Sequence, residues 1–149
     1  MTDPSGSGAM PVLVVRRTIH ATTERLFEAW TNPAQLLSWW GPEGVNCVGA
    51  EIDLRVGGRY RIGNEFPNGS VLWIAGAFEV VEPPHRLVYS WGLEGRSGPA
   101  ERVTVRFEPR DGSTEVLIIH ERIRDEALRD EHQRGWRDCL DGLAEYLER

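Results

Sequence analysis

The sequence contains no lysine, and its 17 basic residues are all arginine. Enzymes that form a Schiff base use a lysine amine as the nucleophile, so this class of chemistry is excluded. No apolar run approaches the roughly 20 residues that cross a bilayer, and the N-terminus lacks the charged and apolar blocks of a signal peptide. We therefore expect a cytoplasmic protein with no membrane segment.

Cysteine is also scarce. Cys47 and Cys139 are the only two, and neither belongs to a CxxC pair or to a cluster with metal-site spacing. We expect two free, reduced thiols, no metal ion and no cofactor. The net charge of −6 argues against a nucleic-acid partner, because phosphates attract a basic surface. A GxSxG motif and a phosphate-binding glycine loop are also missing.

The composition fits one globular domain, with 149 residues of which 40% are hydrophobic and 27% are charged. Residues 1–10 are small, polar and glycine-rich, which predicts a disordered tail, either native or left by cloning. We expect the single domain to span residues 11–149.

An apolar stripe with helical spacing runs through residues 125–149. At about 100° per residue its members fall within an arc of roughly 140°. A stripe built only for packing would be leucine throughout, but this one carries polar or small residues in its first half. We predict a long C-terminal helix whose first half faces a space and whose second half is anchored by leucines. The stripe comprises Leu128, His132, Gly135, Trp136, Cys139, Leu140, Leu143, Tyr146 and Leu147.

The rest of the chain has the polar and apolar alternation of half-buried strands. Thr22 or Thr23 is the expected N-cap of a first short helix, and Pro33 starts a second that ends near Trp39. No βαβ alternation indicates a parallel sheet. We predict an α+β fold in which an antiparallel sheet curves around the C-terminal helix. The expected strands are residues 12–20, 47–54, 59–62, 71–81, 85–91, 102–109 and 114–123.

Several segments together resemble a known family. They are WWGP at residues 39–42, DLRVGGRY at 53–60, VVEPPHRLVYSW at 80–91, VTVRF at 103–107, GW at 135–136 and CLDGL at 139–143. The chain resembles the START-like (SRPBCC) helix-grip superfamily, in the branch named for the activator of heat-shock-protein-90 ATPase. The resemblance implies about seven antiparallel strands around the C-terminal helix, two short helices at one end and an apolar cavity between helix and sheet. We expect the chain to lack the separate N-terminal domain with which the eukaryotic activator grips its chaperone.

On this fold, aromatic and apolar side chains would line the cavity, as is typical of ligand pockets. The alternative for each is simple core packing, and Trp39 and Trp40 are interpreted as a plug at one end of the sheet. Glu101 and the other acidic residues that alternate along the strands are interpreted as the solvated sheet face, paired with arginines. The candidate ligand-binding residues are Tyr60, Ile62, Trp73, Tyr89, Trp91, Val103, Val105, Phe107, Ile118, His120, His132, Trp136 and Cys139.

His120 and His132 are the sharpest candidates, because a strand and the gripped helix would present them to each other across the cavity. Histidine can hydrogen-bond or transfer protons near neutral pH. The alternative is that nearby groups such as Glu121 or Arg122 satisfy both rings. Cys139 is interpreted as packing rather than as a nucleophile, since His132 is two helical turns away.

Three functions follow from these patterns. The first is a binding protein, monomer or homodimer, for a small apolar or aromatic molecule, with residues 92–100 and 67–70 gating entry. The second, which the patterns favour less than binding, is an enzyme of the polyketide cyclase or dehydratase kind. His120 or His132 would act as acid or base, and Trp136 and Tyr89 would position a flat substrate. The third is an interaction protein, a sequestering or cochaperone-like partner that uses the exposed sheet. A resistance protein that captures a toxic natural product is a variant of the first.

Overall fold

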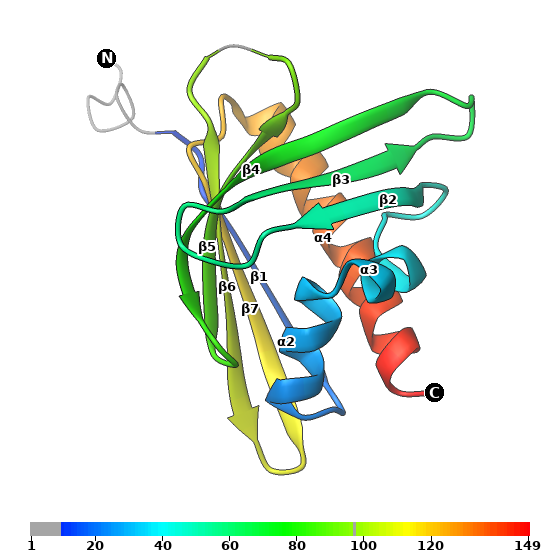
Figure 1. The fold of residues 1–149 in the computed structure, drawn as a ribbon, viewed down its shortest axis with the longest axis vertical. Coiled ribbons are helices and arrows are strands. Elements are labelled where there is room, and N and C mark those ends of the chain that lie inside the picture. Colours follow the sequence, from blue (N-terminus) through cyan, green and yellow to red (C-terminus); the bar gives the residue numbers. More distant parts are fainter. Residues whose placement is uncertain (1–9, 97) are drawn as a thin grey trace.

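The computed structural model describes residues 10–96 and 98–149, and it confirms the predicted helix-grip architecture. Seven antiparallel strands form one curled sheet in the order β1-β7-β6-β5-β4-β3-β2 (Figure 1). The predicted tail lies almost wholly outside the described residues. The strands are β1 (Leu13–Ile19), β2 (Asn46–Ile52), β3 (Arg59–Glu65), β4 (Val71–Glu82), β5 (Arg86–Leu93), β6 (Glu101–Arg110) and β7 (Ser113–Glu121), and the helices are α2 (Thr23–Thr31), α3 (Pro33–Trp39) and α4 (Glu126–Leu147).

Side-chain caps set the start of each helix. Thr22, Asn32 and Asp125 each accept a hydrogen bond from a backbone N–H of the following first turn, at 3.1, 2.9 and 2.9 Å respectively. These N–H groups have no partner within their helix, and such a cap stabilises a helix by about 1 kcal/mol. The caps explain why the helices begin where the sequence predicted them.

The two short helices connect the opposite edges of the sheet. β1 is one edge strand and β2 is the other, and α2 and α3 carry the chain between them. α4 lies on the concave side, where it packs against β1 and α3 (Figure 1). None of the helices in residues 10–96 and 98–149 combines the length and apolar character that a membrane crossing needs.

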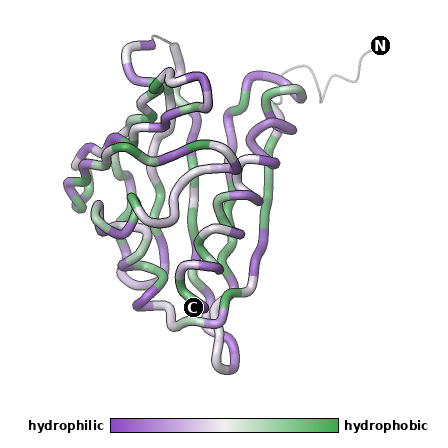
Figure 2. The backbone as a smooth tube through the Cα atoms, turned by 90° about the vertical axis from the view of Figure 1, so that its right-hand side faces the viewer, coloured by the Kyte–Doolittle hydropathy of each residue, from purple (hydrophilic) through white to green (hydrophobic). Residues whose placement is uncertain are grey.

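The core lies between the second half of α4 and the inward face of the sheet. Leu140, Leu143 and Leu147 are buried there, as predicted. Buried and more exposed residues alternate along β7, and Figure 2 shows hydrophobic and hydrophilic positions alternating along the backbone. This alternation places every second side chain of a strand against the helix.

Candidate functional site

A groove of about 1070 Å³ opens between the first half of α4 and strands β3 to β5. His132, Gly135, Trp136 and Cys139 line it from the helix. The odd residues of the helical stripe therefore face the groove, while the leucines that follow face the core. That this groove is the expected ligand cavity stays a prediction.

Three tryptophans from different elements form an aromatic wall on this groove. Trp40 follows α3, Trp91 lies on β5 and Trp136 on α4. The ring of Trp136 lies 5.6 Å from Trp40 and 5.4 Å from Trp91, measured between centroids. Trp40 was expected to plug the sheet only, but it also lines the groove, where its Nε1–H donates to Asn64 Oδ1 at 3.0 Å.

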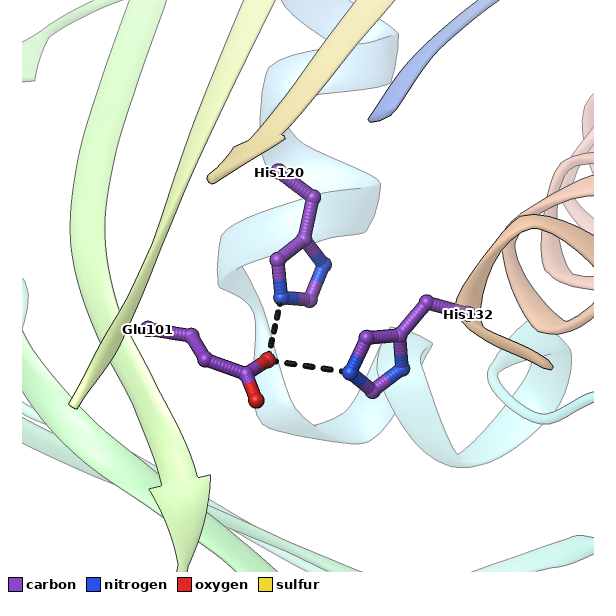
Figure 3. Close-up of side chains that lie close together, drawn as sticks. All are labelled: Glu101, His120 and His132. Carbon is purple, nitrogen blue, oxygen red and sulfur yellow. Dashed lines mark hydrogen bonds and ion pairs between the residues drawn. The ribbon is translucent and has the colours of Figure 1, made fainter. Parts of the chain in front are cut away.

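Two histidines and one carboxylate meet beside this wall (Figure 3). His120 Nε2 lies 2.7 Å and His132 Nε2 lies 2.9 Å from the same oxygen, Glu101 Oε1. The two imidazole rings stack with centroids 4.4 Å apart and an interplanar angle of 17°. β7, α4 and β6 each supply one member, so the cluster exists only in the folded chain.

The indole of Trp136 fixes the proton positions in this cluster. Its Nε1–H donates to His120 Nδ1 at 3.0 Å, and an indole can only donate. His120 Nδ1 must therefore be the unprotonated nitrogen, and the ring proton resides on Nε2. His120 consequently donates to Glu101, which accepts as a carboxylate.

The electrostatics agree with this assignment. Burial opposes ionisation of Glu101, but the hydrogen bonds from His120 and His132 outweigh it and lower the pKa of the carboxyl to about 2. Burial also lowers the pKa of the His120 imidazole, and the hydrogen bond to Glu101 offsets part of this effect. Glu101 is therefore charged and His120 neutral near pH 7.

Glu101 is a functional candidate that the sequence interpretation placed wrongly on the solvated face. Its side chain is only 18% exposed. The sequence signal was the alternation along the strand, which places residues 101, 103, 105 and 107 of β6 on one face. Val103, Val105 and Phe107 on this face are completely or almost completely buried. A charged residue in phase with three buried ones marks a buried polar site.

The same three ligand atoms lie within 4.8 Å of one another, close enough to consider a metal ion. A metal on His120 Nε2 would leave the ring proton on Nδ1, where it would face the N–H of Trp136. Metal-bound histidines normally donate that proton to a carboxylate or carbonyl, and an indole offers no acceptor. The donor pattern therefore favours a hydrogen-bonded network over a metal centre.

Other predicted site residues lie deeper in the core. Tyr60, Ile62 and Tyr89 border a separate void of about 20 Å³, which has room for one water molecule at most. Burial raises the pKa of both tyrosines. Tyr60 donates to Ser90 O at 2.7 Å, and Tyr89 accepts from Trp30 Nε1 at 3.3 Å.

Val103, Val105, Phe107 and Ile118 are completely or almost completely buried and line neither space. Packing against the helices accounts for them: Phe107, for example, makes an edge contact with Phe27 at 5.9 Å. The structure does not bring these four residues to the groove.

The prediction that Trp73 lines the cavity is wrong. Trp73 of β4 pairs in register with Gly63, and its indole covers Gly49 and Gly63 on the face of the sheet opposite Ile62. The Arg61 guanidinium lies 3.7 Å from the ring centroid in a cation–π contact. Because Gly49 and Gly63 have no side chains, the indole of Trp73 can lie flat against the outer face of the sheet.

Cys139 borders the groove but is 2% exposed. Burial raises the pKa of its thiol to about 12. A thiol is a nucleophile only as the thiolate, so Cys139 packs rather than reacts, in agreement with the sequence interpretation.

The predicted entry segments lie at the groove to different degrees. Residues 92–96 and 98–100 line it, whereas for the turn at residues 67–70 only the flanking Phe66 and Leu72 do. Whether either segment gates entry stays a prediction.

Comparisons with known proteins agree with the fold. The family model described as Activator of Hsp90 ATPase homolog 1-like protein matches residues 20–148. The search of curated proteins found no match.

Several solved structures are similar over almost the whole chain. The AHSA1 protein SPO3351 from Silicibacter pomeroyi is 27% identical with a TM-score of 0.82, over 93% of this chain and 98% of that one. Protein CV1439 from Chromobacterium violaceum is 25% identical with a TM-score of 0.82, over 93% and 97%. CalU16 from Micromonospora echinospora is 25% identical with a TM-score of 0.73, over 99% and 81%. With the family model matching most of its length, the chain belongs to the Activator of Hsp90 ATPase homolog 1-like family.

Proposed function

We propose that this protein binds a small, flat, largely apolar molecule in the groove between the sheet and the first half of α4. The observation that carries the proposal is the wall of Trp40, Trp91 and Trp136 along an open groove of about 1070 Å³. Aromatic walls with a few convergent polar groups are typical of small-molecule sites.

Gly135 supports the proposal from the helix side. A Cβ at this position would meet no neighbouring atom within 4 Å, and the residue lines the groove. Glycine in a helix interior costs about 0.5–1 kcal/mol relative to alanine. Its presence in the middle of α4 keeps space open that any side chain would reduce.

The test is binding of N-phenyl-1-naphthylamine, a neutral aromatic dye whose fluorescence rises in apolar surroundings. We expect saturable binding to the wild type and little to Gly135→Leu, whose side chain would occupy the groove. Arg137→Leu is the matched control, because it adds the same side chain at an exposed position of α4 outside the groove. Equal binding by all three proteins would refute the proposal.

Native mass spectrometry of protein purified from its own host would identify the natural ligand. A co-purifying molecule that is absent from Gly135→Leu and present in Arg137→Leu would identify the groove as its site. That the protein acts in the cytoplasm, as a monomer or homodimer, or together with a chaperone, stays a prediction.

The second candidate function is proton-transfer catalysis, favoured by the pairing of His132 with Glu101. Glu101 receives the Nε2–H of His132, which orients the ring as a carboxylate orients a catalytic histidine. The test substrate is 5-nitrobenzisoxazole: a base takes the C3 proton, the C–H electron pair forms the nitrile, and the N–O bond breaks to release a phenolate. Turnover that His132→Ala abolishes while dye binding persists would support catalysis, and unchanged turnover would exclude His132 as the base.

A further inference from the structure

The Glu101 carboxylate uses only one of its two oxygens within the cluster. Both imidazole N–H groups reach Oε1, at 2.7 and 2.9 Å. Figure 3 shows the second oxygen, Oε2, turned away from both rings. No side chain or backbone N–H of residues 10–96 and 98–149 donates to Oε2, while the residue itself lines the groove.

The second oxygen, Oε2, is not among the buried side-chain atoms that lack a partner, so water in the groove can supply its donor. Because Glu101 is only 18% exposed, a bound molecule that displaces this water must bring a donor of its own, or the charged oxygen loses its hydrogen bond. The histidines cannot supply this donor, because His120 has its one proton on Nε2 and His132 Nε2 already donates to Oε1. A donor carried by a bound molecule would complete the site.

The charge of the groove indicates what kind of donor fits. Five arginines and four acidic side chains line it, so its walls are close to balanced and favour neither a strongly cationic nor a strongly anionic molecule. The aromatic wall beside the carboxylate suits a flat ring. A neutral hydroxyl on such a ring meets both conditions and forms a charge-assisted O–H···O⁻ bond, which is shorter and stronger than a neutral one.

We propose that the groove selects an uncharged aromatic molecule with a hydroxyl group, of the phenol or enol class, and that this hydroxyl donates to Glu101 Oε2. The inference rests on the proposed function, because it names the polar anchor of the same groove. His120 and His132 are positioning residues in this site, since they hold the carboxylate ionised and aim its free oxygen.

The experiment compares 2-naphthol with 2-methoxynaphthalene, which has the same ring but no donor. A hydrogen bond to a charged group is worth about 1.5–3 kcal/mol, so wild-type protein should bind 2-naphthol roughly 10- to 100-fold more tightly. In Glu101→Gln the preference should fall to within about threefold, because an amide offers only a neutral partner. Arg137→Leu should keep the wild-type preference.

Each other outcome has a distinct meaning. If neither naphthalene binds the wild type, the proposed function itself fails. If both bind equally, the groove binds ligands but the hydroxyl anchor is overturned. Tighter binding of 2-naphthoate or of 2-naphthylmethylamine than of 2-naphthol would also overturn it, in favour of an anionic or a cationic ligand. The wild-type comparison stands even if Glu101→Gln fails to fold.

Discussion

Two glycines in α4, Gly135 and Gly142, should respond oppositely to the same substitution. A Cβ at Gly135 would meet nothing within 4 Å, whereas one at Gly142 would lie 2.9 Å from the backbone oxygen of Trp39. Both positions are in the helix interior, so alanine brings each the same gain in helix propensity, about 0.5–1 kcal/mol. The difference between the two variants therefore isolates the contact with α3.

The contact with the Trp39 carbonyl sets the expected difference in unfolding free energy between the two variants. A carbonyl of the neighbouring helix cannot rotate aside as a flexible side chain can, and overpacking of this kind costs about 1–3 kcal/mol. We expect Gly135→Ala to stabilise the protein by about 0.5–1 kcal/mol. We expect Gly142→Ala to be less stable than Gly135→Ala by about 1–3 kcal/mol.

Urea unfolding followed by far-UV circular dichroism measures both free energies, and equal m-values would show that the unfolding reaction is unchanged. Thermal unfolding provides a second reading, at roughly 2–4 °C per kcal/mol for a chain of this size. Equal stabilisation of both variants would refute the close packing of α4 on α3. Destabilisation by Gly135→Ala would refute the open space beside that residue.

Four further predictions concern the polar cluster and the thiols. The pKa of Glu101 is about 2 in the folded protein and about 4.3 in an unfolded chain, so its ionisation contributes stability above pH 4.3 that is lost as the pH falls through 2. Urea titrations at decreasing pH should show a steeper loss of unfolding free energy for the wild type than for Glu101→Gln. Parallel profiles of the two proteins would contradict this. Trp136→Phe leaves the buried His120 Nδ1 without its donor and should lower the free energy of unfolding by about 1–3 kcal/mol. The same variant removes the obstacle to a metal, so Zn²⁺ should raise its Tm and not that of the wild type; equal shifts would speak against the assigned proton positions. In the native protein at pH 8, Ellman's reagent should react with Cys47 and not with Cys139. Both thiols should react in urea. Two reactive thiols in the native protein would contradict the burial of Cys139.

The fold was predictable because local signals and the family resemblance agree. The caps at Thr22, Asn32 and Asp125 are short-range features visible in the sequence. The leucines in the second half of α4 pack in the core, as the helical spacing of the apolar residues indicated. Each of these signals depends on neighbours within a few positions.

The site was less predictable, because its members come from three elements. His120 and His132 were identified as a pair, but their shared partner is Glu101, whose charge suggested a solvated position despite its inward parity. Trp73 failed for a different reason. β4 is apolar at both even and odd positions, so its alternation does not reveal which face a residue occupies.

Which face of β4 carries Trp73 depends on residues that are distant in sequence. Trp73 covers Gly49 on β2 and Gly63 on β3, and no pattern within β4 specifies those neighbours. Strand register is set by pairing across the sheet. A prediction of the groove lining from one strand at a time therefore has no means of excluding Trp73.

The arrangement of the sheet edges also determines the order in which this protein can be completed during synthesis. β1 is synthesised before the other strands, yet Leu13 pairs with His120 of β7. β1 therefore has no pairing strand until β7 has been synthesised. Contacts of such long sequence separation slow folding and leave strand edges open in the meantime. The histidine–carboxylate cluster shares this constraint, because His132 on α4 is made after Glu101 on β6 and His120 on β7. The groove therefore forms only after α4 has docked on the sheet.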